Sequence, residues 1–348
     1  MNIGIAGYIT QHGGTYLSEL FKEAIPNSIY VINPSRGMPP IDTIVKIIES
    51  NNINVLLSIE THAKSSLGLD NLRYLKDHYN VKLIEIPMID CCPISWVTGN
   101  VYSIFDSILC LSEYCYNIFS KYYSNTHLLR LGIKDQFLPI TNNANITFLH
   151  PSGWGGKKGV YRKSTLECLT AFNQLLSIRT DVKLILTSQW SYKEFSKFYG
   201  KKVSDLDTLL ESPNITGIFK DLDRAAFLNL YNSTDILLYP SKKEGVGMGV
   251  FEALSRGIPC ILTNMHPYNE FITHGLNSWL CEVVKTTSIK NIFTPLCYPS
   301  INSIIDILSN LDKNDILKMR EQIRETILDY FNWEKFVDNL NNLVGGVN

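Results

Sequence analysis

Short runs of aliphatic and β-branched residues alternate with longer amphipathic stretches along nearly the whole chain. Such alternation is typical of parallel sheets whose strands are connected through helices. In the first half, the pattern predicts strands at residues 3–7, 28–32, 55–59, 82–87, 107–111 and 127–130. The alternation restarts after residue 145, where it predicts strands at 146–150, 183–187, 215–219, 236–239 and 259–263. The sequence therefore predicts an α/β protein built from two Rossmann-like, doubly wound units.

A segment rich in turn-forming residues, at about 138–145, separates the two halves. A chain of 348 residues has room for two domains of ordinary size. We therefore expect an N-terminal Rossmann-like domain at 1–140 and a second Rossmann-like domain at 141–325. A long helical pattern at about 315–344, interrupted near 332–333, ends the chain. We expect residues 326–348 to form a closing helix that packs back on the N-terminal domain.

The composition argues against several classes of protein. The formal net charge is -1 and no block of basic residues occurs, which argues against a nucleic-acid partner. No apolar run reaches the ~18 residues of a membrane span, so we expect a soluble protein, and contact with a membrane surface stays open. The amino terminus lacks the positively charged region of a signal peptide and is interpreted as a first buried strand.

The eight cysteines include no C-x-x-C pair, and no histidine lies near them at the spacing of a zinc site. Most stand within apolar runs, where cysteine behaves as a small hydrophobic residue. We therefore expect buried thiols in place of disulfides or a metal site. Free thiols indicate a reducing compartment, which is the cytoplasm or the inner face of a membrane.

Residues 235–272 are the most informative segment. A predicted strand at 236–239 leads into a loop with Gly245, Gly247 and Gly249, and a helix follows to about residue 256. A glycine-rich turn from a strand into a helix exposes backbone N–H groups at the positive end of the helix, which suits an anion. Two carboxylates flank this turn: Glu244 in the loop and Glu252 eight residues later. The glycines alone are weak evidence, because most such loops merely turn the chain.

The complete string resembles the hallmark of the family 4 retaining glycosyltransferases, also called glycosyl transferases group 1. That hallmark places two glutamates, with seven residues between them, within a Pro-Ser-x-x-Glu-Gly-x-Gly…Glu-Ala…Gly-x-Pro run. The matching positions are Pro240, Ser241, Glu244, Gly245, Gly247, Glu252, Ala253, Gly257 and Pro259. The resemblance implies the GT-B fold, in which two Rossmann-like domains face each other across a cleft. It also implies that the domain at 141–325 binds the donor and that the domain at 1–140 lies on the acceptor side.

The resemblance also implies roles for the residues of this segment. Glu252 would hold the ribose hydroxyls of a nucleotide, and Glu244 would contact the hydroxyls of the donor sugar. The backbone along the sugar and diphosphate would be that of Gly245, Val246, Gly247, Met248 and Gly249. The alternative is structural, with Glu244 in a salt bridge of the loop and Glu252 on a solvated helix face.

A second family feature is the Arg162-Lys163 pair, which stands ten residues before Phe172 at the end of an Ala-Phe helix, as in the family. Such cations would neutralise the diphosphate leaving group, in place of a metal ion. Lys158, in the sequence Lys-Lys-Gly, is a rival cation, and Ser-Gly-Trp replaces the family's Gly-Arg ahead of this loop. A solvated basic loop without a ligand is the alternative.

The N-terminal half offers weaker candidates. Gly13 and Gly14, preceded by His12, resemble the family's glycine loop that faces the diphosphate, whereas the G-x-G-x-x-G dinucleotide fingerprint is missing. Asp90 follows a predicted strand and is the candidate for a part in catalysis on the acceptor side. Glu60 and His62 follow the preceding strand and are further acceptor-side candidates. For each of these residues, a plain loop or capping role is the alternative.

Together these features predict a retaining glycosyltransferase that uses a nucleotide diphosphate sugar as substrate and needs neither metal nor cofactor. No Asp-x-Asp string stands beside a strand end. A non-catalytic nucleotide-sugar-binding protein on the same scaffold remains an alternative, and a Rossmann oxidoreductase is a weaker one. The sequence leaves open the donor base, the sugar, the oligomeric state and the acceptor, which could be a glycan, a lipid-linked molecule, a protein or a small molecule.

Overall fold

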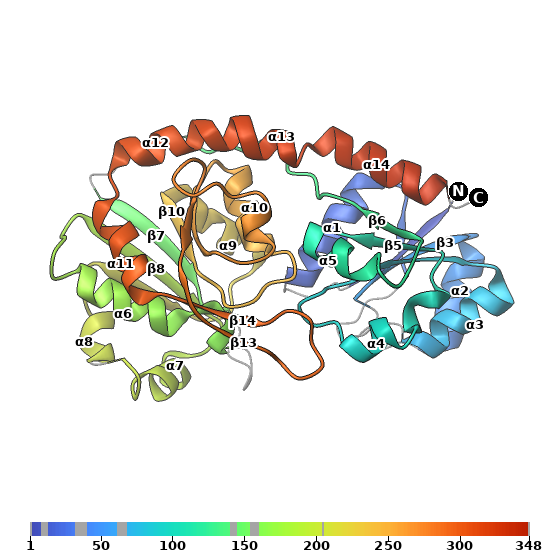
Figure 1. Ribbon diagram of the computed structural model, residues 1–348, viewed down its shortest axis with the longest axis horizontal. Coiled ribbons are helices and arrows are strands. Elements are labelled where there is room, and N and C mark those ends of the chain that lie inside the picture. The colour runs from blue at the N-terminus through green and yellow to red at the C-terminus, as the bar shows by residue number, and fades with distance from the viewer. Residues whose placement is uncertain are drawn as a thin grey trace.

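The computed structural model describes residues 2–7, 13–31, 40–60, 68–139, 145–153, 160–203 and 205–346. Two six-stranded sheets lie side by side, one in each half of the chain, and helices cover them (Figure 1). Every strand pair within these two sheets is parallel. The structure therefore confirms the predicted α/β architecture of two wound units.

The first sheet has the strand order β2-β1-β3-β4-β5-β6. All five residues of its central strand β3 are buried, as expected for a parallel strand that is covered on both faces. The strands are β1 (Ile3–Ala6), β2 (Ile29–Tyr30), β3 (Val55–Ile59), β4 (Lys82–Ile86), β5 (Ser107–Cys110) and β6 (Thr126–Leu128). The helices are α1 (Gly13–Ala24), α2 (Ile41–Ser50), α3 (Leu69–Tyr79), α4 (Ile94–Thr98), the 3-10 helix η2 (Val101–Ile104) and α5 (Glu113–Phe119).

The second sheet has the order β12-β11-β10-β7-β8-β9. Its strands are β7 (Ile146–Pro151), β8 (Val182–Ser188), β9 (Ile215–Phe219), β10 (Ile236–Tyr239), β11 (Cys260–Thr263) and β12 (Trp279–Cys281), and β13 (Val283–Thr287) and β14 (Leu296–Pro299) form an antiparallel hairpin after it. The longer helices are α6 (Thr165–Leu175), α7 (Tyr192–Tyr199), α8 (Leu206–Leu210), α9 (Arg224–Leu230), α10 (Met248–Ser255) and α11 (Ile301–Asn310). The 3-10 helices are η3 (Val160–Lys163), η4 (Tyr231–Ser233) and η5 (Tyr268–Glu270). The sequence pattern did not predict β12 or the hairpin.

A series of helices returns from the second sheet to the first, along the top of Figure 1. It comprises α12 (Lys313–Gln322), the π-helical turn η6 (Ile323–Ile327), α13 (Leu328–Tyr330) and α14 (Trp333–Gly345). The predicted interruption near 332–333 agrees with Asn332, whose side chain caps the start of α14 by accepting a hydrogen bond from the backbone N–H of Lys335. Phe336 of α14 contacts Phe21 of α1, with ring centroids 5.8 Å apart.

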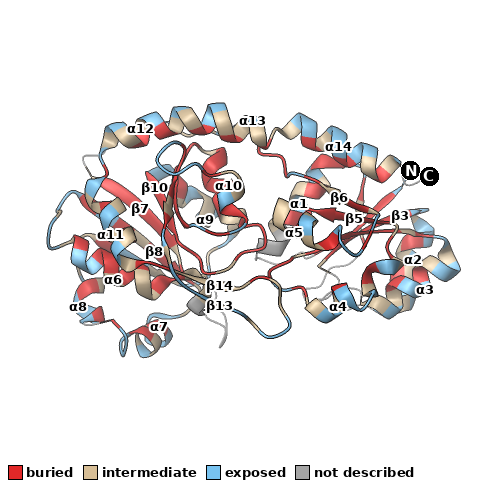
Figure 2. Cartoon of the chain, viewed as in Figure 1, coloured by how far each residue is buried: buried red, intermediate tan, exposed pale blue. Residues whose placement is uncertain are grey.

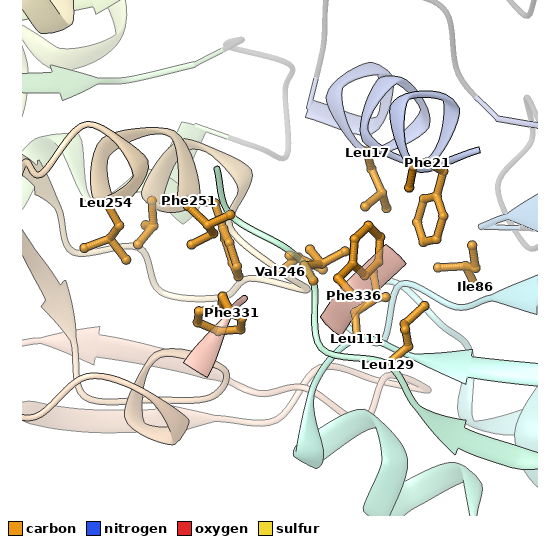
Figure 3. Packing of buried hydrophobic residues seen from close by; sticks show 14 of the residues in the cluster. Leu17, Phe21, Ile86, Leu111, Leu129, Val246, Phe251, Leu254, Phe331 and Phe336 are labelled. Atoms are coloured by element: carbon orange, nitrogen blue, oxygen red, sulfur yellow. The ribbon is translucent and has the colours of Figure 1, made fainter. Parts of the chain in front are cut away.

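One hydrophobic core runs through both halves of the molecule. Val246 and Phe251 of the second half belong to the same buried cluster as Leu17 and Leu111 of the first half (Figure 3). Phe331 completes an aromatic contact with Phe251 at 4.8 Å between centroids. Each sheet also packs on a core of its own, and Figure 2 shows the buried residues along the strands. The two units are therefore held together by apolar packing and not only by the linker.

The hairpin forms a second bridge between the halves. Asn291, in the turn between β13 and β14, accepts a hydrogen bond at its backbone carbonyl from the N–H of Ile94, at 2.9 Å. Its side chain accepts from the backbone N–H of Ser95 and donates to the hydroxyl of the same residue, each at 3.0 Å. The start of α4 is therefore tied to the second half.

The eight cysteines are free thiols. Six of them are buried as expected, whereas Cys91 is exposed and Cys297 is half-buried, so the expectation of buried thiols is wrong at these two positions. Cys91 lies in the turn after β4, and Cys297 lies in the hairpin, which is why neither enters a core. None of the described helices is long and apolar enough to cross a membrane.

Replacing Phe336 by alanine should destabilise the protein by about 3–5 kcal/mol, because the side chain is 1% exposed and packs between α14 and the first sheet's helices. Urea unfolding monitored by fluorescence measures the change as a lower unfolding midpoint. The control is Tyr122→Ala, at a side chain that is 49% exposed, and it should change the midpoint little. Equal midpoints for the two variants would contradict a structural role of the α14 contact.

Candidate functional site

The loop between β10 and α10 is shaped by two glycines. Gly247 has a φ of +82°, in the left-handed region, and a Cβ atom on it would lie 2.7 Å from the hydroxyl oxygen of Tyr268. A Cβ atom on Gly245 would lie 2.5 Å from Oδ1 of Asp90, a residue of the other half. The loop can therefore adopt this path, and approach the first half this closely, only with glycine at these positions.

Glu244 of this loop is buried, with 5% of its surface exposed, and its carboxylate accepts four hydrogen bonds. Lys163 Nζ donates to Oε1 at 2.5 Å, and Arg162 Nη1 donates to Oε2 at 3.1 Å. The hydroxyls of Ser241 and Tyr239 donate to Oε1 at 2.8 Å and 3.2 Å. The structure thus brings together the predicted carboxylate and the predicted Arg-Lys pair, which lie about 80 residues apart in the sequence.

The electrostatics of this cluster follow from burial and charge. Burial alone would raise the pKa of Glu244, but the charges of Arg162 and Lys163 outweigh it and hold the pKa below its usual value. Burial and repulsion by Arg162 lower the pKa of Lys163 to about 8, although Glu244 acts in the opposite direction. Glu244 also raises the pKa of Arg162. The carboxylate and the guanidinium are therefore charged near neutral pH.

Asp90 brings a carboxylate from the first half into the same cluster. Its Oδ2 lies 3.4 Å from Arg162 Nη1, and its backbone carbonyl accepts a hydrogen bond from Lys243 Nζ at 2.9 Å. Burial raises the pKa of Asp90, against the effect of Arg162. Thr294 of the hairpin donates to the carbonyl of Ile89 at 3.2 Å, which supports the turn that carries Asp90. The cluster thus contains three cations, Arg162, Lys163 and Lys243, and two carboxylates, Glu244 and Asp90. This excess of positive charge favours binding of an anion.

Glu252 lies in the second turn of α10 and is also buried, at 7% exposure. Its Oε1 forms an ion pair with Arg224 Nη1, and its Oε2 lies 3.5 Å from the hydroxyl of Tyr231. Burial raises the pKa of Glu252, and Arg224 limits the rise. The solvated helix face of the structural alternative is excluded, since the carboxylate is buried. The Tyr231 hydroxyl also donates to the carbonyl of Gly249 at 3.1 Å.

The remaining predicted residues are placed as follows. Gly13 and Gly14 are the first residues of α1. Glu60 follows β3 with a φ of +59°, and its backbone N–H donates to the carbonyl of Ile86. Val246 is buried in the core that joins the two halves, and Met248 packs against that core. Lys158, His12 and His62 lie outside the described residues.

Sequence reasoning missed Arg224 and Lys243 as members of this site. Arg224 is the first residue of α9, after an Asp223 cap, and nothing in its sequence context connects it with Glu252, 28 residues further on. Lys243 directly precedes the hallmark glutamate, so its position in the motif was a usable signal. Within the described ranges, no group of three or more His, Cys, Asp or Glu side chains could hold a metal ion.

Residues 158–294 match the family described as Glycosyl transferases group 1. These residues contain Arg162, Lys163, Glu244 and Glu252, and also the hairpin strand β13 and its tip. The match therefore covers the part of the cluster that the second half contributes.

Two curated relatives match over part of their length. The chain is 31% identical over 156 residues to N-acetyl-alpha-D-glucosaminyl L-malate synthase of Bacillus anthracis, which covers 40% of this chain and 38% of that protein. It is 27% identical over 116 residues to UDP-Gal:alpha-D-GlcNAc-diphosphoundecaprenol alpha-1,3-galactosyltransferase of Escherichia coli, covering 33% of this chain and 26% of that protein. The chain thus spans less than two fifths of the length of either relative.

Solved structures extend the similarity in fold to the whole chain. Sucrose-phosphate synthase of Thermosynechococcus elongatus has a TM-score of 0.69 at 13% identity, covering 100% of this chain and 99% of that one. HepE of Anabaena, solved with UDP and glucose, has a TM-score of 0.68 at 11% identity, covering 99% and 100%. These neighbours show the predicted GT-B fold. Within its second half, residues 158–294 are similar in sequence to the glycosyl transferases group 1.

Proposed function

We propose that this chain is a retaining glycosyltransferase that moves a sugar from a nucleotide diphosphate donor onto an acceptor hydroxyl without a metal ion. The observation that carries the proposal is the cluster of Arg162, Lys163 and Glu244 beside the N-terminus of α10. A sugar diphosphate needs cations for its leaving group and a hydrogen-bond acceptor for its sugar hydroxyls. The cluster offers both, with the cations from η3 and the carboxylate from the β10–α10 loop.

The donor would lie along the β10–α10 loop. The carboxylate of Glu252 would accept hydrogen bonds from the ribose, and Arg162 and Lys163 would face the diphosphate together with the N–H groups at the start of α10. A ligand that draws the cations toward its phosphates would free Glu244 to accept hydrogen bonds from the sugar. UDP is the first nucleotide to test, since HepE was solved with UDP.

The acceptor would approach from the first half, on the side of Asp90. In a retaining transfer, the bond from the anomeric carbon to the diphosphate oxygen breaks while the acceptor oxygen bonds to that carbon on the same face. The acceptor proton passes to the departing phosphate oxygen. The protein then contributes chiefly positioning and stabilisation of the diphosphate charge. Acceptors to test include small hydroxy acids and lipid-linked saccharides, which the names of the two relatives suggest.

Two measurements test the proposal. A thermal-shift panel of UDP, GDP and ADP should raise the unfolding midpoint with one of them, because a ligand that binds only the folded protein stabilises it. The matching nucleotide sugars, labelled in the sugar, should then be hydrolysed slowly, with faster turnover once an acceptor is supplied. Binding without any turnover would favour the non-catalytic alternative, and no binding would contradict the proposal.

Glu252 and Glu244 should have different roles, the first in binding the nucleotide and the second in turnover of the sugar. Glu252→Ala should weaken binding of the free nucleoside diphosphate by about 1.5–3 kcal/mol, tenfold or more, because it removes the acceptor of the ribose hydroxyls. Glu244→Ala should leave that affinity nearly intact and lower kcat, since its contact matters most as the sugar acquires charge. Calorimetry with the diphosphate, beside initial rates, separates the effects. Equal losses of nucleotide affinity in both variants would contradict this division.

Transferase activity should not depend on divalent metal ions, so removing them with EDTA should leave it unchanged. Because Arg162 and Lys163 would supply the positive charge at the diphosphate, initial rates in EDTA should equal those in added Mg²⁺. The same assay, followed by NMR of the product, should show that the anomeric configuration of the donor is kept. A strict requirement for Mg²⁺ or Mn²⁺, or inversion at the anomeric carbon, would contradict the proposed mechanism.

Nucleotide affinity should fall as the pH rises through about 8, the pKa of Lys163 in the free protein. Below this pH the ammonium is charged and attracts the diphosphate, and above it the attraction is lost. Lys163→Arg should remove the decline, because a guanidinium stays charged throughout this range. The control is Lys183→Arg, at an exposed residue of β8, which should keep the wild-type profile. A decline that is unchanged in Lys163→Arg would show that another group titrates.

A further inference from the structure

Arg224 lies between the two halves of the molecule, with a partner on each side. Its Nη1 atom forms an ion pair with Glu252 of α10. Its guanidinium carbon lies 3.4 Å from the ring centroid of Tyr16, a residue of α1 in the first half. The Arg224 side chain is 34% exposed, whereas that of Glu252 is 8% exposed. One cation therefore connects a buried carboxylate of the second half with an aromatic ring of the first.

Helix stability does not explain an arginine at this place. Arg224 is the first residue of α9, where the helix dipole disfavours a positive charge. The start of α9 is already capped by Asp223, whose side chain accepts a hydrogen bond from the backbone N–H of Ala226 at 2.7 Å. The contacts of Arg224 thus point away from its own helix and toward Glu252 and Tyr16.

Arg224 leaves part of the acceptor capacity of the Glu252 carboxylate unused. An ionised carboxylate can accept about four hydrogen bonds. The described contacts are the ion pair with Arg224 at Oε1 and the long contact with Tyr231 at Oε2, at 3.5 Å. Acceptor positions are therefore left for a pair of ribose hydroxyls while Arg224 keeps its ion pair. An ionised carboxylate is needed for this, because a protonated one loses acceptor capacity.

The charged groups around Glu252 make Arg224 the principal support of its ionised form. Burial raises the pKa of Glu252, and Arg224 opposes the rise more strongly than Arg256 does. The Arg256 guanidinium donates to the backbone carbonyl of Glu252, at 2.9 Å. Tyr231 faces the carboxylate from η4, and Tyr16 faces Arg224 from α1.

We propose that Arg224 is a positioning residue of the nucleotide site, which holds the Glu252 carboxylate ionised and oriented for ribose, and that Tyr16 fixes Arg224 from the opposite half. This proposal rests on the proposed function, in which Glu252 binds the nucleotide. It adds that the nucleotide affinity of the second half depends on contact with the first. Removing a ring on α1 should therefore weaken a ligand that binds at α10.

The test uses the full chain and calorimetry with UDP, GDP and ADP between pH 6 and 8. Arg224→Gln should weaken binding of the preferred nucleotide about tenfold, as expected for loss of a charged hydrogen bond. Its affinity should also fall on acidification from a higher pH than in the wild type, because Glu252 becomes protonated more readily. Arg224→Lys keeps the charge and should recover part of the affinity and the wild-type pH profile.

Two further variants define the role of the aromatic ring. Tyr16→Leu should weaken binding about threefold, the size expected for a lost cation–π contact. The matched control is Arg324→Gln, since Arg324 also stacks on an aromatic ring, Phe137 at 4.0 Å, and pairs with a carboxylate, Asp135, at 3.3 Å. That control should bind the nucleotide as the wild type does. Thermal unfolding midpoints check that each variant is folded.

The outcomes separate this proposal from the proposed function. If Arg224→Gln binds as the wild type at every pH while Glu252→Ala does not, the positioning role is wrong and the proposed function stands. Tighter binding by Arg224→Gln would mean that the arginine blocks the carboxylate, and it would also overturn the proposal. If Arg224→Gln binds more weakly with an unchanged pH profile, and Arg224→Lys recovers no affinity, then Arg224 has only a structural role. Undiminished affinity in Glu252→Ala, or no nucleotide binding by the wild type, would contradict the proposed function itself.

Discussion

The buried carboxylate of Glu244 is the constraint on which the arrangement of the site depends. A buried charge is costly unless it is paired and hydrogen-bonded. Its partners are the hydroxyls of Tyr239 in β10 and Ser241 in its own loop, and the Arg-Lys pair of η3. Two segments far apart in the sequence must therefore converge for Glu244 to be ionised, and Asp90 of the first half contacts the same arginine.

Apolar packing holds these segments in place. Val246 of the loop and Phe251 of α10 are buried in the core that also contains residues of α1 and α14 (Figure 3). The turn between β13 and β14 adds hydrogen bonds on both sides of Asp90, to Ile89 before it and to Ser95 after it. The functional groups are thus carried by loops whose ends are fixed in packed elements, which is what a precisely placed site requires. The apolar packing of the two halves stabilises the arrangement in which these like charges lie close together.

The fold could be predicted from the sequence, because local patterns encode it. The same holds for the part of the site formed by Glu244 and the Arg162-Lys163 pair. Alternating runs indicate parallel strands, and the spacing of Glu244 and Glu252 sets their places relative to α10. The hairpin and β12 were not predicted, since β13 is mostly exposed and β12 is only three residues long. Their strands are defined by pairing with distant partners and not by periodicity. The Arg224–Glu252 pair could not be predicted either, because it depends on α9 and α10 lying close together in the folded protein. The contact of Asp90 with Arg162 was likewise inaccessible, although both residues were candidates.

The most direct test of the central claim is a crystal structure of the protein with UDP bound. The diphosphate should lie against Arg162, Lys163 and the N-terminus of α10, and the ribose hydroxyls should bind to the carboxylate of Glu252. The Glu244 carboxylate should then face the space beyond the terminal phosphate, where the sugar would attach. A nucleotide bound elsewhere on the molecule, or a diphosphate that touches neither cation, would show that the Arg162, Lys163 and Glu244 cluster is not the donor site.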